Sequence, residues 1–310
     1  MCPASITVRS LGPDDVPSAV ALFNARFPHN QITERSFHRV VFGDAHYDPD
    51  STLIAFDAGV LSGFACAVIG EPERETGECN GYVKAFLFAG EREDAGAALL
   101  GRICSFLSSR GVKRVQAGEY GGGPYFFPGV DLRYEDTVGF FETHGWRTTG
   151  TIQDMRIELS SWSLTDRDRA RIEEVEGRGI AIKPFAPVMI PAMKVFVEQM
   201  QEKNWFREGW EDVWAKGRPA VVAFDSGGII GYAEYRPSKA EGSFGPTEVL
   251  ESRRERGIGS VLLLAAMLLL KETGARAATA HWVYPPELYT HRGWSTCRRY
   301  AVFGKTLGDG

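Results

Sequence analysis

The stretch that decides the fold is Glu251-Ser252-Arg253-Arg254-Glu255-Arg256-Gly257-Ile258-Gly259, between a predicted strand, 247–250, and an apolar helix, 261–270. Two glycines at this spacing let successive backbone N–H groups point toward one position, and the helix adds the positive end of its dipole. A diphosphate fits such a cradle. A plain strand-to-helix turn with solvated arginines is the alternative interpretation.

A second informative element, residues 285–294, has the sequence Pro-Pro-Glu-Leu-Tyr-Thr-His-Arg-Gly-Trp. It predicts a short helix that carries Tyr289 and ends at Gly293, where a left-handed residue is needed. The R-x-x-G-x-G pattern of Arg254, Gly257 and Gly259, followed by this element, resembles the acyl-CoA loop and the tyrosine element of the GNAT N-acetyltransferase superfamily. A buried core tyrosine is the alternative for Tyr289.

The resemblance implies acetyl-CoA as co-substrate and Tyr289 as the catalytic proton donor to the leaving CoA thiolate. A backbone N–H of Val249 or Leu250 is expected to polarise the thioester carbonyl. Because the acceptor amine must lose a proton before it attacks, we expect Glu248 as the catalytic base, with Glu241 and His281 as alternatives. The expected cofactor-binding residues are Val249, Leu250, Arg254, Arg256, Gly257, Ile258, Gly259 and Ser260.

The composition limits the class of protein. A chain of 310 residues, 44% hydrophobic and 24% charged, is long enough for two globular domains. Its five cysteines contain no C-x-x-C pair, so we expect neither a disulfide framework nor a metal site. The net charge of −5 argues against a nucleic-acid partner, and no apolar run approaches the ~20 residues that span a bilayer. Without a secretory pattern at the N-terminus, we expect a cytoplasmic protein, a monomer or a homodimer, whose partner is a small-molecule amine.

A faint internal repeat organises the chain. The spacing from Gly96 to Gly111 equals that from Gly259 to Gly274, and Phe141 stands where the second half has Tyr289. The repeat also places Glu91, Glu93 and Asp94 where the second half has Arg254, Arg256 and Gly257. Carboxylates repel a diphosphate, so the first copy is expected to have lost both CoA binding and the proton donor.

The repeat predicts an α/β fold of two tandem GNAT-like domains, each a twisted mixed sheet flanked by helices. We expect a degenerate domain at 1–160, a capped linker helix at 161–178 and a catalytic domain at 179–310. The resemblance adds that two central parallel strands part to admit the pantetheine of CoA. The arrangement, although not the substrate, is similar to that of mycothiol synthase.

Two further segments leave alternatives open. The glycine- and proline-rich stretch 120–131 is an insertion in the first half that either shapes a pocket or simply connects two elements. In 204–214, Trp205 and Trp210 either contact a substrate or belong to an aromatic stripe packed on protein.

Three functions are compatible with these features. The leading one is an acetyl-CoA-dependent N-acetyltransferase that acts on a small amine in the C-terminal domain. A non-catalytic acyl-CoA-binding or regulatory protein is the alternative. An aminoacyl-tRNA-dependent transferase is disfavoured by the acidic composition and the intact CoA loop.

Overall fold

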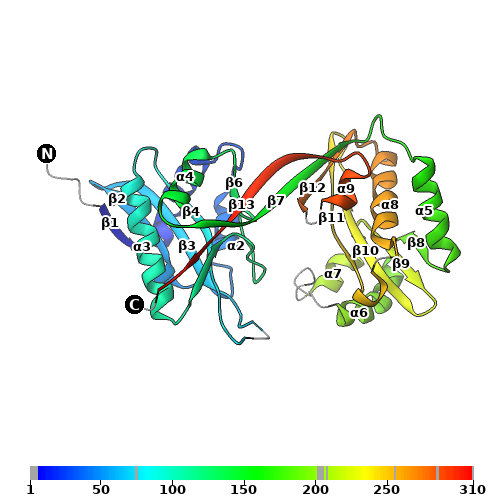
Figure 1. Ribbon diagram of the computed structural model, residues 1–310, viewed down its shortest axis with the longest axis horizontal. Coiled ribbons are helices and arrows are strands. Elements are labelled where there is room, and N and C mark those ends of the chain that lie inside the picture. The colour runs from blue at the N-terminus through cyan, green and yellow to red at the C-terminus, as the bar shows by residue number, and fades with distance from the viewer. Residues whose placement is uncertain are drawn as a thin grey trace. The chain divides into compact units, whose positions relative to one another are not determined.

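The computed structural model describes residues 6–73, 76–200, 206, 209–254, 256–283 and 286–308. The chain forms two compact units: unit 1 comprises Met1–Ile152 and Arg299–Gly310, and unit 2 comprises Gln153–Arg298. In each unit a mixed sheet is covered by helices on both faces (Figure 1). The predicted α/β class, with two tandem domains that each hold a mixed sheet flanked by helices, is therefore confirmed.

In unit 1 the strands follow the order β1-β2-β3-β4-β5-β13, and a short strand, β6, also pairs with β13. Among the strand pairs of its described residues, only β4–β5 is parallel. The strands are β1 (Ile6–Ser10), β2 (Thr52–Asp57), β3 (Val60–Ile69), β4 (Gly81–Phe88), β5 (Arg114–Ala117), β6 (Val130–Asp131) and β13 (Ser295–Thr306). The helices are α1 (Val16–Arg26), α2 (Glu34–Val41), α3 (Glu93–Ser109) and α4 (Glu135–Thr143).

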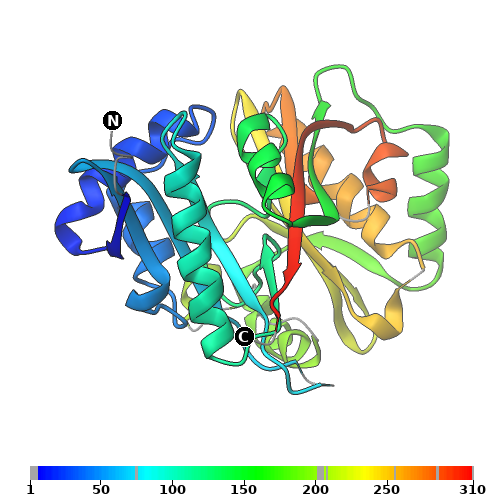
Figure 2. The same cartoon turned by 60° about the vertical axis from the view of Figure 1, so that its left-hand side comes forward.

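The strands of unit 1 are apolar on both faces because helices cover both. Leu53 and Ala55 of β2 belong to the core under α3, whereas Ile54 between them belongs to the core under α1 and α2. Successive side chains of a strand point to opposite faces, so this alternation places α3 on one face and α1 and α2 on the other. Figure 2 shows α3 lying along the sheet.

In unit 2 the strands follow the order β7-β12-β11-β10-β9-β8. The strands are β7 (Arg147–Glu158), β8 (Ala181–Pro184), β9 (Ala220–Asp225), β10 (Gly228–Arg236), β11 (Glu241–Val249) and β12 (Ala277–Val283). The helices are α5 (Asp166–Gly177), α6 (Ile190–Gln199), α7 (Trp210–Ala215), α8 (Ile258–Glu272) and α9 (Glu287–Thr290). Alternation on β9 again separates two cores, with Val221 and Ala223 under α8 and Ala220 and Val222 under α6.

The two central parallel strands of unit 2 part after a few residue pairs. β11 and β12 pair from Glu241 and Ala277 to Phe244 and Ala280, and among the described residues no pair follows Phe244. At that point the register of β11 against β10 shifts, so that Gly245 and Pro246 form a bulge. Bulges of this kind turn a strand away from its neighbour and are frequent beside active sites.

The units differ from the expected domains in two places. Residues 299–310, expected in the C-terminal domain, belong to unit 1, because Phe303–Thr306 of β13 pairs with β5. The expected linker helix at 161–178 belongs to unit 2 as α5. It is capped, as predicted, and the structure identifies Thr165 as the capping residue, while Val175 is part of the unit 2 core. Strands β7 and β13 each contribute residues to both units (Figure 1).

The described part of the chain contains no helix with the length and apolar character required to cross a membrane.

Candidate acyl-CoA site

The loop that precedes α8 in unit 2 has the backbone that an anion cradle requires. Gly257 is the N-cap of α8 and has a φ of 79°, in the left-handed region that favours glycine. The intrahelical bonds begin with the N–H of Val261, which donates to the Gly257 carbonyl at 3.2 Å. The N–H groups of Ile258, Gly259 and Ser260 precede that bond, so they are available to an anion at the helix terminus.

The arginines of the loop are anchored to their surroundings. Arg254 donates to Glu248 at 2.8 Å and to the carbonyl oxygen of Val249 at 3.2 Å, so its guanidinium lies along the end of β11. Arg253 pairs with Asp225 at 2.9 Å. Arg254 thus engages the carboxylate of Glu248, the residue that the sequence suggested as the base. The role of Glu248 as the base stays a prediction.

Helix α5 lies against this loop, which the sequence did not indicate. A Cβ built on Gly257 would stand 2.8 Å from Cδ of Arg171, so the arginine packs directly on the glycine. Arg178, at the end of the same helix, donates to the carbonyl oxygen of Arg256 at 3.2 Å. The sequence does show the arginine-rich run Arg167-Asp168-Arg169-Ala170-Arg171, but such a run is also typical of a solvated linker helix, so it did not predict this contact.

Tyr289 lies at the point where β11 and β12 part. Its ring meets Phe244, the last paired residue of β11, with centroids 5.9 Å apart, and Trp294 at 5.5 Å. The residue is only 8% exposed, and burial raises the pKa of its hydroxyl to about 12. Tyr289 therefore stays protonated at neutral pH, as a proton donor must.

The two other candidate bases differ in their surroundings. Glu241 accepts hydrogen bonds from Thr279 and from Arg156, and these bonds hold the pKa of its carboxyl below the ordinary value. His281, in contrast, lies with Nδ1 3.3 Å from a carboxylate oxygen of Asp154. Asp154 is 3% exposed and also accepts the backbone N–H of Trp282 at 3.0 Å, so it fixes both the ring and the backbone beside it.

Tyr289 and His281 lie on opposite faces of the parted strands. Ala278 and Ala280 of β12 belong to the core under α8, which also contains Tyr289. Because side chains alternate along a strand, His281 points to the face opposite α8. A thioester held between the strands would thus have a proton donor on one side and an oriented imidazole on the other.

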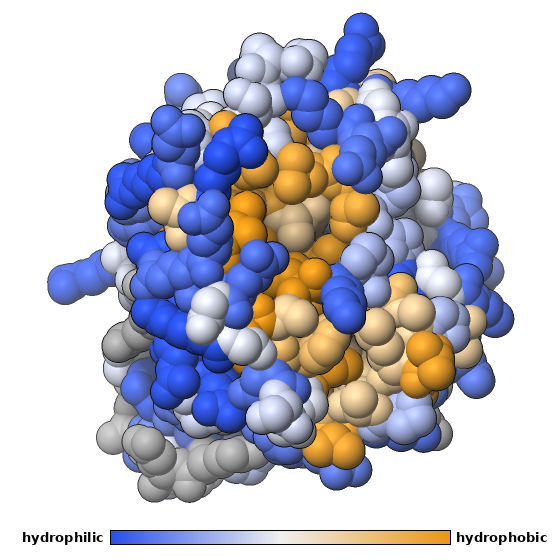
Figure 3. Space-filling model, turned by 90° about the vertical axis from the view of Figure 1, so that its right-hand side faces the viewer, coloured by the Kyte–Doolittle hydropathy of each residue, from blue (hydrophilic) through white to orange (hydrophobic). Residues whose placement is uncertain are grey.

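The start of the loop also borders an apolar wall. A cavity of about 320 Å³ beside Leu250 and Arg253 is lined by the apolar side chains of Val195, Ile229 and Ile230. Figure 3 shows that apolar side chains gather in a hollow on the surface of unit 2, inside a rim of hydrophilic side chains. Uncharged parts of a ligand bound near the loop have apolar surface available there.

The corresponding loop of unit 1 is built differently. Helix α3 already begins at Glu93, so Asp94 is helical, and its carboxylate accepts the N–H of Ala95 at 2.9 Å. Arg92 forms ion pairs with Asp57 and Asp94. The first turn of α3 therefore carries two carboxylates, Glu93 and Asp94, which would repel a diphosphate and so support the prediction that unit 1 does not bind CoA.

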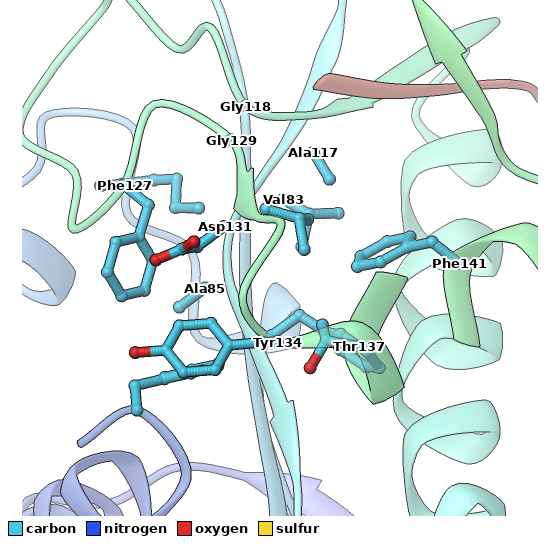
Figure 4. Close-up of a pocket in the computed structure, with 14 residues that line it drawn as sticks. Val83, Ala85, Ala117, Gly118, Phe127, Gly129, Asp131, Tyr134, Thr137 and Phe141 are labelled. Carbon is cyan, nitrogen blue, oxygen red and sulfur yellow. The ribbon is translucent and has the colours of Figure 1, made fainter. Parts of the chain in front are cut away.

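The parted strands of unit 1 are filled by the inserted segment 120–131. β4 and β5 pair only as far as Val83 and Ala117, and beyond them lies a pocket of about 40 Å³. Figure 4 shows Phe127 of the insertion and Phe141 of α4 on opposite sides of this pocket. The insertion thus shapes a pocket, one of the two roles left open, and the space that remains suits a few water molecules.

A buried polar network anchors the insertion to unit 1. Lys84, at the β4 bulge, forms an ion pair with Asp44 and donates to the carbonyl oxygen of Val40 at 2.7 Å. Tyr120 donates to Asp44 at 2.9 Å, and the backbone N–H of His46 also bonds to Asp44. Burial alone would raise the pKa of Asp44, but these donors outweigh it and hold the pKa below its ordinary value.

The tryptophans of segment 204–214 have a structural role where they are described. Trp214 is 3% exposed, and Trp210 meets it edge to face at 6.0 Å. Both also contact Phe206, and Trp214 contacts Tyr232 of β10. This is an aromatic stripe packed within unit 2. Trp205 lies outside the described residues.

No group of three or more His, Cys, Asp or Glu side chains in the described ranges could hold a metal ion.

No protein-family model and no curated protein matches this sequence. Solved structures do match. A GCN5-related N-acetyltransferase from Sphaerobacter thermophilus has a TM-score of 0.64 at 17% identity, with 100% of this chain and 98% of that chain covered. A tandem GNAT protein from the clavulanic acid biosynthesis pathway has a TM-score of 0.60 at 14% identity, with 99% and 100% covered.

A third match is the GCN5-related glucosamine N-acetyltransferase region of a fungal multi-domain β-N-acetylglucosaminidase, with a TM-score of 0.73 at 18% identity. The match covers 98% of this chain and 38% of that longer protein. At these identities the comparisons show the fold: the chain has the tandem GNAT fold over its whole length.

Proposed function

We propose that the protein is an acetyl-CoA-dependent N-acetyltransferase that acetylates a small amine, with the chemistry in unit 2. The observation that carries the proposal is the position of Tyr289, whose ring packs on Phe244 where β11 and β12 part, in the same unit as the Gly257 cradle. Unit 1 lacks both features, since the first turn of its helix α3 carries the carboxylates of Glu93 and Asp94, and Phe141 replaces the tyrosine.

The proposed reaction places the thioester between the parted strands. The diphosphate of CoA accepts hydrogen bonds from the N–H groups at the start of α8, and the pantetheine reaches toward Gly245. A backbone N–H of β11 at the point where it parts from β12 polarises the carbonyl. The two N–H groups expected from the sequence are engaged elsewhere, because Leu250 donates to the carbonyl oxygen of Ile230 at 3.0 Å and Val249 to the carboxylate of Glu248 at 3.2 Å. The neutral amine then attacks the carbonyl carbon, and the C–S bond breaks to give the CoA thiolate. The proton that the nitrogen loses when it becomes an amide replaces the one that Tyr289 gives to the thiolate.

Two proton transfers accompany this step. An alkylammonium has a pKa of about 10.4 and must lose a proton before it can attack, so a base is required. We assign this role to His281, because buried Asp154 orients its ring, rather than to Glu248, which Arg254 engages. Tyr289 then protonates the thiolate. Its pKa of about 12 opposes full transfer, but the same burial also destabilises the thiolate that receives the proton.

The alternative, a protein that binds acyl-CoA without catalysis, is favoured by one observation: the two carboxylates of β11 that the sequence offered as bases, Glu241 and Glu248, are ion-paired. A thiol-release assay with acetyl-CoA and a panel of small amines, amino sugars and antibiotics separates the two. Amine-dependent CoA release that disappears in Tyr289→Phe supports the enzyme. Calorimetric binding of acetyl-CoA at one site per chain, without release for any amine, supports the binder.

A further inference from the structure

Unit 2 contains a pocket at the start of α8 that the proposed reaction does not use. It is a cavity of about 190 Å³ lined by three arginines: Arg167 and Arg171 of helix α5, and Arg292 in the turn after α9. Ser260, in the first turn of α8, also lines it. We call this cavity the arginine pocket. One water molecule needs a cavity of only about 15 Å³, so a group much larger than water fits into the arginine pocket.

The three guanidinium groups are close enough to repel one another. Arg292 is half-buried, and its Nε is buried without a hydrogen-bond partner in the described part of the chain. Burial lowers the pKa of Arg292, and the charges of Arg167 and Arg171 lower it further, against the opposing effect of Asp168. Like charges gathered around a cavity are stabilised when an anion enters it.

Two carboxylates, those of Asp168 and Glu287, also line the arginine pocket, and in the described part of the chain neither forms an ion pair with its arginines. Asp168 is engaged at the N-terminus of α5, where it accepts the hydroxyl and the backbone N–H of Thr165 at 2.7 and 3.0 Å. Glu287 is exposed at the start of α9. Arg171 is paired with Glu174 at 2.6 Å, and Nη1 of Arg292 donates to the carbonyl oxygen of Leu288 at 2.7 Å. Arg167 and the unsatisfied Nε of Arg292 are therefore the main donors for an anion in the described part of the chain.

We propose that the arginine pocket binds the 3′-phosphomonoester of CoA, with Arg167, Arg171 and Arg292 as its ligands. The proposal rests on the proposed function and adds a phosphate site outside the loop. Arg171 packs on Gly257, and Ser260 belongs to the same helix turn as the cradle, so the pocket adjoins the expected diphosphate position. In CoA the ribose carries the diphosphate and the phosphomonoester on nearby carbons, which requires two adjacent anion sites.

The chemistry of the side chains favours a phosphomonoester over other anions. A guanidinium presents planar N–H donors that match phosphate oxygens, and a dianion offsets more of the charge than a carboxylate does. Helix α5 lies before β8 in the chain, outside both the loop and the tyrosine element. Recognition of this phosphate would therefore depend on a third segment of the sequence.

The test compares CoA with dephospho-CoA, which lacks only the 3′-phosphate, by titration calorimetry on the full-length protein. Wild type is expected to bind CoA about 10- to 100-fold more tightly. Arg167→Ala, an exposed position on α5, should lose most of this preference while its affinity for dephospho-CoA stays within about twofold. Arg169→Ala is the matched control, because Arg169 is exposed on the same helix and does not line the pocket.

The outcomes separate the two proposals. Equal affinity of wild type for CoA and dephospho-CoA would overturn the phosphate site and leave the proposed function standing. A preference for CoA that survives in Arg167→Ala/Arg171→Ala would place the phosphate elsewhere, and so would overturn it too. If neither ligand binds wild type at millimolar concentration, the proposed function fails together with the inference.

Discussion

Tyr289 packs edge to face on Trp294, with ring centroids 5.5 Å apart at an interplanar angle of 85°. Phe141 packs on Trp146 in unit 1 with nearly the same geometry, 5.2 Å and 84°. The two units thus repeat one packing motif and differ in it by a single hydroxyl group. Because Phe141 already packs in this way in unit 1, we expect the Tyr289→Phe variant to keep the packing of unit 2.

Tyr289→Phe should lower kcat by about 10²–10⁴ while the Kd for acetyl-CoA changes less than twofold, because proton donation to the thiolate occurs only in the transition state. Steady-state kinetics and calorimetry measure the two quantities. Tyr235→Phe is the matched control, since Tyr235 packs on the same core of unit 2. Turnover near the wild-type value in Tyr289→Phe would remove Tyr289 from the mechanism.

The pH dependence of turnover tests the state of Tyr289 separately. Its pKa of about 12 in the folded protein means that the neutral, proton-donating form persists well above the ordinary value of about 10. We therefore expect kcat to show no decline with a midpoint near pH 10. The same shift predicts a contribution to stability that is complete below pH ~10 and is lost as the pH rises toward ~12. A decline of kcat near pH 10 that is absent in Tyr289→Phe would contradict the buried position.

Two substitutions distinguish the candidate bases. His281→Gln should lower kcat/KM by about 10²-fold or more, because it removes the proton acceptor that Asp154 orients. Glu248→Gln should lower it less than about threefold, since the glutamate pairs with Arg254. Kinetics with the best amine from the screen measure both. The opposite ranking of the two variants would restore Glu248 as the base and contradict the role of His281.

The left-handed Gly257 before α8 and the short helix of Tyr289 that is followed by the left-handed Gly293 could be predicted from the sequence, because each lies within about ten consecutive residues, where spacing and a left-handed glycine are local requirements. The Asp154–His281 pair and the contact of Arg171 with Gly257 could not, because each joins residues that only the folded sheet brings together. The assignment of Phe303–Thr306 to unit 1 was missed for the same reason. A repeat in the sequence shows which elements recur, whereas strand pairing decides to which sheet each belongs.

The cradle can be tested with two glycines at opposite ends of α8. Gly257 and Gly274 have φ values of 79° and 88°, so alanine at either position should cost about 1 kcal/mol of stability through backbone strain. A Cβ at Gly257 also meets Arg171 at 2.8 Å, whereas nothing lies within 4 Å of one at Gly274. We expect Gly257→Ala to weaken acetyl-CoA binding by about tenfold or more and Gly274→Ala to leave it unchanged. Equal affinities in calorimetry would mean that the phosphates bind elsewhere.

The buried ion pair of unit 1 should make its stability sensitive to acid. Asp44 has a pKa below the ordinary carboxyl value, so its ionised form contributes stability that is present above pH ~4 and is lost as the pH falls through the folded pKa. Lys84 is nearly inaccessible, so Asp44→Asn leaves a buried charge without its partner and should cost about 3–5 kcal/mol.

Replacement of both partners, Asp44→Leu with Lys84→Met, removes that uncompensated charge and should recover most of the loss. Urea denaturation at pH 7 and pH 4 measures these differences, with amide hydrogen exchange of β2, β3 and β4 to follow unit 1, because Trp146 is only one of the chain's seven tryptophans. Two results would contradict this account of how the inserted segment is held: a double variant as unstable as Asp44→Asn, or the same acid sensitivity in wild type and the double variant.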